Sequence, residues 1–299
     1  SMMWNVKRAL TRWLPRPADA LSDDVRRVVT HTSFELVPLK NLATQLPEIP
    51  PGAHVSVTCS PAKGLDVTID LAAQLQASGI HATPHIAARL VRDSAHAREL
   101  AARFREAGFE EIFVIAGDEA TPTGEYDGAL PFLRDLLAES HGLQRIGVAA
   151  YPDGHVFLDR PVLRQALRDK QAVLADACVD GWASTQMCFD ASTITRWLRA
   201  ERAEGLTLPV RLGIPGPVDR TKLLTMGMKV GVGQSLRYLK KNRSGLFKLM
   251  TGTSYDPGHL LESIGSELGQ LGVVGLHLFT FNQVGGSVAW QRGAVGGSA

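Results

Sequence analysis

The sequence predicts an α/β fold, a single-domain (β/α)8 TIM barrel, on two observations. Eight short runs rich in Val, Ile, Ala and Leu recur along the chain, and most of them lack the polar alternation of half-exposed strands. Strands of that kind are typical of a parallel sheet that is buried on both faces. Amphipathic segments separate the runs, with a strand-to-strand step of mostly about 30 residues, the size of a strand–helix–strand unit.

The predicted elements follow one another in alternation along the chain. The strands are expected at Thr32–Val37, His54–Thr58, Ala82–Ile86, Ile112–Ala116, Ile146–Ala150, Trp182–Met187, Val210–Ile214 and Val274–Phe281. The helices between them are expected at Asp66–Ser78, Ser94–Ala107, Ala129–Glu139, Arg160–Leu174 and Ala191–Ala203. Glycines follow four of these helices, as C-terminal caps should.

Both ends of the chain and one long connection add to this repeat. Extra helices between strands 7 and 8 are expected at Arg220–Met228, Gln234–Met250 and Pro257–Leu271. We divide the chain into an N-terminal helical extension over residues 1–30, with a basic amphipathic helix at Trp4–Leu14, a catalytic barrel over 31–293 and a flexible tail over 294–299. The alternative, an open doubly wound sheet, would carry a glycine-rich fingerprint after the first strand, where Pro38–Asn41 has none.

Composition narrows the class of partner. The formal net charge is +2, without the basic surface that nucleic-acid binding requires, and no apolar run reaches the length of a membrane span. Three cysteines without metal-ligand spacing fit a reducing compartment better than a disulfide framework. We therefore expect a cytoplasmic protein, a monomer or small homo-oligomer, that acts on a small molecule and not on nucleic acid or a membrane.

Polar residues at the C-terminal ends of strands are the candidates for chemistry, because these ends form the active-site mouth of a barrel. Glu35 interrupts an apolar strand, and a buried carboxyl group resists ionisation, so it can act as a general acid. Asp118 follows Gly117 and can stabilise a developing cation, while the amide of Gln186 can both donate to and accept from a heterocycle. Each also has a structural interpretation: a Glu35 ion pair with a residue such as Arg89 or Arg211, a turn aspartate, and a buried glutamine.

Further polar residues stand at other predicted strand ends, namely His85, Tyr151, His155 and Asn282. Each could instead satisfy backbone groups in a loop. The chain has neither a His-Glu-x-x-His spacing nor a Gly-x-Ser-x-Gly elbow, so we expect no metal site and no serine nucleophile.

Taken in chain order, these motifs resemble the methylenetetrahydrofolate reductase family: Ser33–Glu35, Val57–Thr58, Pro84–His85, Gly117–Asp118, Ala149–Pro152, Thr185–Gln186 with Phe189–Asp190, and His277–Asn282. The resemblance implies that Glu35 is the general acid, that Asp118 faces the pterin and that Gln186 contacts folate. We expect Tyr151 and Phe279 to line the folate site as well. Thr58, His85, His155 and Gln186 are our candidates for contacting a nicotinamide.

The flavin side of the family pattern is different in this chain. Ala116 precedes Gly117-Asp118 where flavin-binding members carry arginine, and Cys59 follows Val57-Thr58. Counting back from Gln186, the basic pair that holds the flavin phosphates falls on Leu174 and Ala175. The nearby residues Arg160, Arg164, Arg168 and Lys170 are interpreted as a solvated helix face. The chain thus resembles the flavin-independent actinobacterial branch, which implies that FAD is absent and that a nicotinamide gives its hydride directly to the folate. We expect NADH in preference to NADPH, but the sequence does not distinguish the two.

The sequence therefore predicts reduction of 5,10-methylenetetrahydrofolate to 5-methyltetrahydrofolate by direct hydride transfer from NADH. Two alternatives stay open: an FAD-dependent reductase, and a folate-binding barrel without turnover. A barrel enzyme acting on another pterin or one-carbon substrate is a third.

Overall fold

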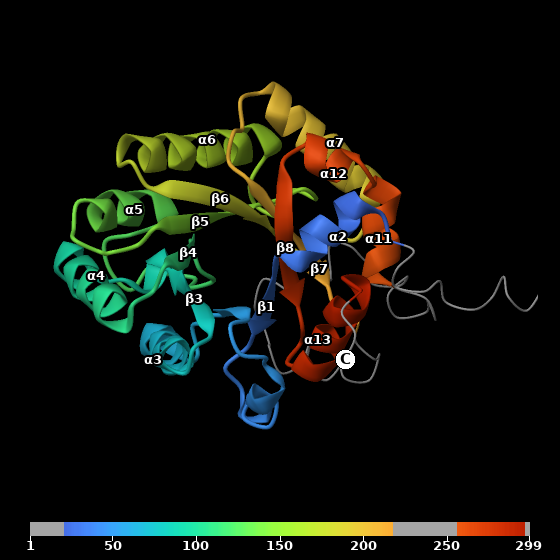
Figure 1. Cartoon of the computed structure of the whole chain (residues 1–299). Coiled ribbons are helices and arrows are strands. Elements are labelled where there is room, and N and C mark those ends of the chain that lie inside the picture. Colours follow the sequence, from blue (N-terminus) through green and yellow to red (C-terminus); the bar gives the residue numbers. More distant parts are fainter. Residues whose placement is uncertain (1–20, 218–255, 297–299) are drawn as a thin grey trace, which may run out of the picture.

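The structure, a computed structural model, describes residues 21–217 and 256–296. Eight parallel strands close into a barrel in the order β1 to β8, with β8 pairing back onto β1 (Figure 1). This confirms the predicted (β/α)8 TIM barrel. The strands are β1 Thr32–Leu36, β2 His54–Val57, β3 His81–Ala87, β4 Glu111–Ile115, β5 Arg145–Ala150, β6 Asp180–Thr185, β7 Val210–Pro215 and β8 Val273–Phe279.

Helices cover the outside of this barrel, and the five predicted between strands 2 and 7 are all present within a few residues of their expected bounds. They are α3 Gly64–Ala77, α4 Ser94–Ala107, α5 Ala129–Leu137, α6 Arg160–Asp176 and α7 Ala191–Ala203. Gly108 caps α4 at a φ of 71°, as predicted. Within residues 21–217 and 256–296, none of the helices has the length and hydrophobicity to cross a bilayer.

Two helices, one before β1 and one after β8, have bounds that were not predicted from the sequence. In α2 (Asp23–Thr30), the Ser22 side chain accepts a hydrogen bond from the Val25 amide, and the buried valines face β8. In α13 (Val284–Ala294), three glycines weaken the helical pattern, and the helix reaches the first residue of the predicted tail. The sequence rules assign such short or glycine-containing segments poorly.

The long connection before β8 is described only in its second half. There α11 (Pro257–Ile264) and α12 (Glu267–Gln270) replace the single helix expected at Pro257–Leu271, because Gly265 breaks it with a φ of 65°. The helices predicted at residues 4–14, 220–228 and 234–250 lie outside the described residues.

Three short 3-10 helices complete the described elements: η2 Lys40–Leu42, η3 Leu46–Glu48 and η4 Ala88–Leu90. The first two follow β1, and η4 follows β3 directly. These segments therefore belong to the loops around the mouth of the barrel.

The interior of the barrel contains charged and aromatic side chains. Glu111 on β4 forms an ion pair with Arg211 on β7, a contact between strands that are not neighbours in the sheet. The indole of Trp182 lies beneath the Arg211 guanidinium, 3.9 Å from its carbon. A Cβ at Gly147 would lie 2.3 Å from this indole, so glycine provides the space. The aliphatic side chains of the strands instead pack outward against the helices.

Candidate active site

A cavity of about 770 Å³ opens at the C-terminal ends of β4, β5 and β6. This is the end of the barrel at which active sites form, and the volume suits a drug-sized or larger ligand. Its outer wall is made by α6 and α7. Its polar lining includes Asp118, Tyr151, His155, Gln186, Arg160, Arg164, Lys170 and Arg196.

Asp118 and Gln186 reach this cavity because of how β4 and β6 end. Gly117 follows β4 with a φ of 100°, and a Cβ there would lie 2.9 Å from the Ala87 Cβ, so glycine is required for this turn. After β6, the backbone N–H of Gln186 donates to the Ala150 carbonyl at 2.8 Å, which keeps the chain beside β5. The structure therefore brings Asp118 and Gln186 to one cavity.

Tyr151 and His155 form an aromatic edge of the same cavity. Their rings meet edge to face, with centroids 5.3 Å apart. Burial raises the pKa of the Tyr151 hydroxyl to about 12, and the negative charge of Asp118 adds to the effect. Tyr151 is therefore a neutral hydrogen-bond donor at physiological pH.

The basic residues of α6 are only in part the solvated face that the sequence suggested: Arg160 is exposed, whereas Arg164, Arg168 and Lys170 are partly buried. Arg160, Arg164 and Lys170 line the cavity. Burial lowers the pKa of the Lys170 ammonium, partly opposed by the charge of Asp169. The i, i+4 spacing was read correctly as one helix face, but that face is turned toward the cavity wall and α7.

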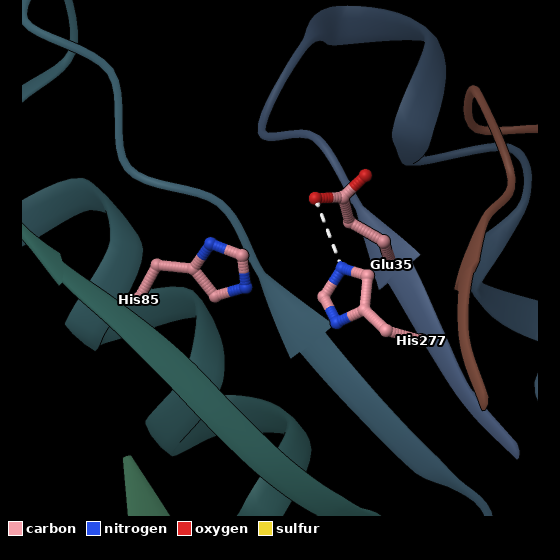
Figure 2. Close-up of side chains that lie close together, drawn as sticks. All are labelled: Glu35, His85 and His277. Atoms are coloured by element: carbon pink, nitrogen blue, oxygen red, sulfur yellow. Dashed lines mark ion pairs between the residues drawn. The ribbon is translucent and has the colours of Figure 1, made fainter. Parts of the chain in front are cut away.

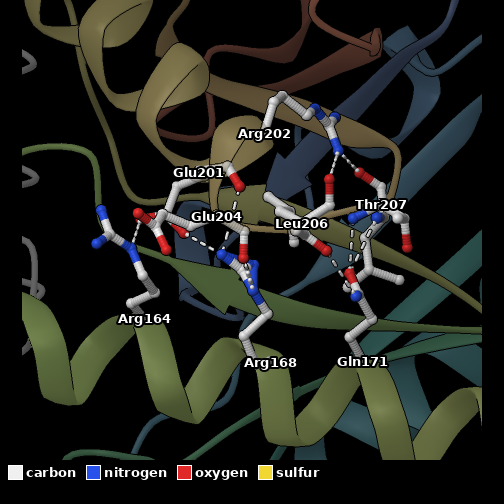
Figure 3. A network of polar contacts seen from close by, with 10 residues as sticks. Arg164, Arg168, Gln171, Glu201, Arg202, Glu204, Leu206 and Thr207 are labelled. Atoms are coloured by element: carbon white, nitrogen blue, oxygen red, sulfur yellow. Dashed lines mark hydrogen bonds and ion pairs between the residues drawn. The ribbon is translucent and has the colours of Figure 1, made fainter.

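Two of these cations also tie α6 to α7 (Figure 3). Arg164 Nε lies 3.1 Å from one carboxylate oxygen of Glu201, and Arg168 contacts the other at 3.4 Å. Their charges are thus balanced in large part by Glu201. Arg160 instead donates to the Pro152 carbonyl, and Lys170 lies near the charge of Asp169, its neighbour on α6.

Leu174 and Ala175, where the resemblance places flavin-phosphate ligands, lie outside the cavity formed by the described residues. Leu174 is 1% exposed and belongs to the hydrophobic core, next to Gly181 at the start of β6. Ala175 is exposed near the end of α6. The cations of α6 that line the cavity therefore come from earlier turns of the helix.

Glu35 belongs to a second cluster, inside the barrel mouth (Figure 2). Its carboxylate Oε1 lies 3.3 Å from His277 Nε2 on β8, and the side chain is 12% exposed. Neither arginine proposed as a partner for Glu35 contacts it: Arg211 pairs with Glu111, and Arg89 donates to backbone carbonyls in the segment after β4. The basic residue that pairs with Glu35 is His277.

His85 on β3 completes this cluster. Its ring centroid lies 5.7 Å from that of His277 and 4.9 Å from that of Phe113. Burial lowers the pKa of His85 well below its usual value, and the nearby His277 lowers it further. His85 is therefore a neutral imidazole at physiological pH.

The remaining predicted residues, Phe279 and Thr58, lie on β8 and directly after β2. Phe279 is the register partner of Glu35, and its ring centroid is 5.0 Å from that of His277. Thr58 follows β2, where its amide donates to the Leu36 carbonyl and its carbonyl accepts from the Thr68 hydroxyl. None of Glu35, Thr58, His85 and Phe279 is among the residues that line the cavity.

The predicted site residues thus form two groups at the mouth of the barrel, one that lines the cavity and one around Glu35. No role was predicted for His277. Its signal was present, because a histidine inside the apolar strand β8 is as unusual as the glutamate inside β1. Asn282 is different: its side chain bonds both the amide and the carbonyl of Val37, which pins the end of β8 to the loop after β1.

The sequence of this chain is similar to that of a known enzyme family. Residues 33–235 match the methylenetetrahydrofolate reductase family. The chain belongs to this family. The matched range contains Glu35, Asp118 and Gln186 but ends before His277, so any role of His277 rests on the contacts described above.

Solved structures share the fold at low sequence identity. An uncharacterised protein from Clostridium thermocellum, which binds two copies of 5-methyl-5,6,7,8-tetrahydrofolic acid, aligns with a TM-score of 0.55 and 11% identity over 90% of this chain and 96% of its own. The Yersinia pestis DHPS in complex with a pterine-sulfa conjugate aligns with a TM-score of 0.45 and 10% identity, over 90% and 94% of the two chains.

Proposed function

We propose that this member of the methylenetetrahydrofolate reductase family reduces 5,10-methylenetetrahydrofolate to 5-methyltetrahydrofolate with hydride taken directly from NADH. One observation carries the proposal: a single cavity joins Asp118 and Gln186 to the cations Arg160 and Lys170. The first pair suits a pterin, and the second pair suits a pyrophosphate. The Clostridium thermocellum neighbour, which binds 5-methyltetrahydrofolate, adds support for the folate.

The folate half of the reaction uses the two carboxylates. Glu35, in its protonated form, donates a proton to N10 of the substrate; the bond between N10 and the bridging carbon breaks, and an iminium cation forms at N5. Asp118 stabilises this cation by its negative charge, and Gln186 fixes the pterin edge. His277 holds the Glu35 carboxyl group and is a positioning residue in this step.

The nicotinamide half supplies two electrons. NADH transfers hydride from C4 of its ring to the exocyclic carbon of the iminium, which gives 5-methyltetrahydrofolate and NAD⁺. Arg160 and Lys170 bind the pyrophosphate, and His155 and Tyr151 contact the planar ring. Because both substrates occupy the mouth together, the rate depends strongly on their mutual orientation.

An FAD-dependent reductase is the second candidate, since the same cations of α6 suit the pyrophosphate of FAD. Two features favour the direct reaction. Ala116, which lines the cavity, offers no cation where flavin-binding members of the family carry arginine. Leu174 and Ala175 contribute no cation to the cavity either.

The test is an absorbance spectrum of the purified protein, followed by NADH oxidation with methylenetetrahydrofolate and no added flavin. We expect a colourless protein, turnover that requires both substrates, and intersecting double-reciprocal lines from a ternary complex. A yellow protein with parallel lines would establish the FAD-dependent reaction. Tight folate binding without NADH consumption would instead establish a non-catalytic folate-binding barrel.

A further inference from the structure

Three strands bring potential metal ligands together at the mouth of the barrel. Glu35 on β1, His85 on β3 and His277 on β8 each offer one donor atom, and these atoms all lie within 4.8 Å of one another. Two imidazoles and one carboxylate are a donor set that binds divalent transition metals, whereas Mg²⁺ and Ca²⁺ prefer oxygen ligands.

His85 provides independent evidence that this cluster binds a ligand. Its side chain is 5% exposed, and its Nε2 atom has no hydrogen-bond partner among the described residues. Figure 2 shows a ring nitrogen of His85 directed toward His277. A buried polar atom without a partner is unfavourable by about 1–3 kcal/mol, so such atoms usually have a ligand or water.

The geometry is close to what a metal ion needs. Bond lengths of 2.0–2.2 Å in a tetrahedral site place the donor atoms about 3.4 Å apart. The Glu35–His277 pair is already at 3.3 Å. The third donor must approach by at most about 1.4 Å to complete such a site. Three protein ligands leave one coordination position open for water or a substrate atom.

We propose that Glu35, His85 and His277 bind a divalent transition-metal ion of the zinc class, and that a bound ion blocks the role of Glu35 as proton donor. A carboxylate that coordinates a metal has its lone pair engaged and carries no proton. The enzyme therefore exists in two exclusive forms, one competent in proton transfer and one inhibited by metal. Metal binding itself does not depend on the proposed function; only its inhibitory effect does.

Calorimetric titration of the chelator-treated full chain with zinc chloride tests the binding. We expect one ion per chain with His85, His277 and Glu35 as ligands. Changes to residues that only support metal ligands lower affinity by about 10–100-fold, so His85→Gln, His277→Gln and Glu35→Gln should each lower it by at least about 100-fold. His259→Gln, at an exposed position on α11, is the matched control and should bind as the native chain does.

Two further measurements decide the outcome. Cobalt bound to the native chain should give visible absorption bands that are lost in His85→Gln, and excess magnesium should not displace zinc. Equal zinc affinity in the native chain and all three ligand variants, or no binding by the native chain, would overturn the proposal. If a histidine variant loses its far-ultraviolet circular dichroism, the near-isosteric Glu35→Gln decides.

Inhibition is measured separately. If the proposed reductase activity is found, zinc should inhibit it, and chelator should restore it. Zinc that binds at the cluster without lowering the rate would overturn the blocking role alone. Absence of reductase activity with intact zinc binding would contradict the proposed function and leave the metal site standing.

Discussion

Two glutamates lie inside the barrel, one toward each end, and their surroundings differ sharply. Glu111 begins β4, and its carboxylate contacts Arg211 and Arg145 at 2.9 Å and the Thr83 hydroxyl at 3.0 Å. Glu35 lies near the end of β1, and its carboxylate contacts the His277 imidazole at 3.3 Å. Both side chains are largely buried, so burial alone does not distinguish them.

Their partners explain which glutamate can do chemistry. Burial alone would raise the pKa of Glu111, but hydrogen bonds and charge from Arg211, with hydrogen bonds from Arg145 and Thr83, lower it to about 2. Two permanent cations thus keep Glu111 ionised. Glu35 instead contacts the imidazole of His277. The closed end of the barrel therefore holds a structural carboxylate, and the mouth holds the carboxylate that we propose to be reactive.

Glu35→Gln tests the reactive side of this comparison and should have the largest effect. Removal of a general acid lowers kcat by about 10²–10⁴-fold, while the KM for folate changes little because the amide keeps the shape of the side chain. Steady-state kinetics with saturating NADH measures this. Glu125→Gln, on an exposed loop, should retain the native rate. An unchanged rate in Glu35→Gln would remove Glu35 from the mechanism.

Glu111→Gln tests the structural side. The variant leaves Arg211 without its carboxylate partner and Arg145 with only its contact to Glu110 at 3.5 Å. Breaking a buried ion pair lowers the free energy of unfolding by about 3–5 kcal/mol. Urea unfolding monitored by circular dichroism gives this value. Glu35→Gln should lose less than about 1 kcal/mol, in the range of ordinary substitutions. Equal losses in the two variants would contradict the division between the two ends.

Acid should lower the free energy of unfolding through protonation of Glu111 at the closed end of the barrel. The pKa of Glu111 is lowered from 4.5 to about 2 in the folded chain, so its contribution is complete above pH 4.5 and is lost as the pH falls toward 2. The native chain should lose about 2 kcal/mol between pH 5 and pH 3 from this group. The Glu111→Gln variant should have a flatter profile over this range. Parallel profiles would show that Glu111 is not the group responsible.

Lys170→Met should have the smallest effect, and it tests the cavity wall instead of the interior. The variant keeps the apolar stem but removes the charge, so the KM for NADH should rise about tenfold, from loss of one charge-assisted contact. The KM for folate should stay the same. Arg98→Ala, at an exposed ion pair on α4, is the control. A rise in the folate KM alone would place the nicotinamide coenzyme elsewhere.

Local pattern predicted most of the fold. Eight apolar strands and five amphipathic helices have periodicities that follow from burial on one face or two, and these determine the barrel. Position at strand ends also located Asp118 and Gln186 correctly at the mouth. The helices α2 and α13 were not assigned, since short or glycine-containing helices depend on tertiary packing rather than propensity.

Contacts between strands that lie far apart in the sequence could not be predicted. The sequence offered Arg211 as a partner for Glu35, but the barrel places it against Glu111 instead, and it places His277 against Glu35. Ligand spacing along the chain gave no metal motif, because Glu35, His85 and His277 come from three separate strands. The side to which the cations of α6 turn was likewise fixed by the neighbouring helix, not by their spacing.

Direct hydride transfer is the central claim, and the fate of deuterium tests it. NADH dideuterated at C4 is reacted with methylenetetrahydrofolate in ordinary water, and the product is analysed by mass spectrometry. Direct transfer predicts one deuterium in every newly formed methyl group. A flavin relay would place the hydride on the flavin ring nitrogen, where it exchanges with water, so a methyl group containing mainly protium would contradict the account.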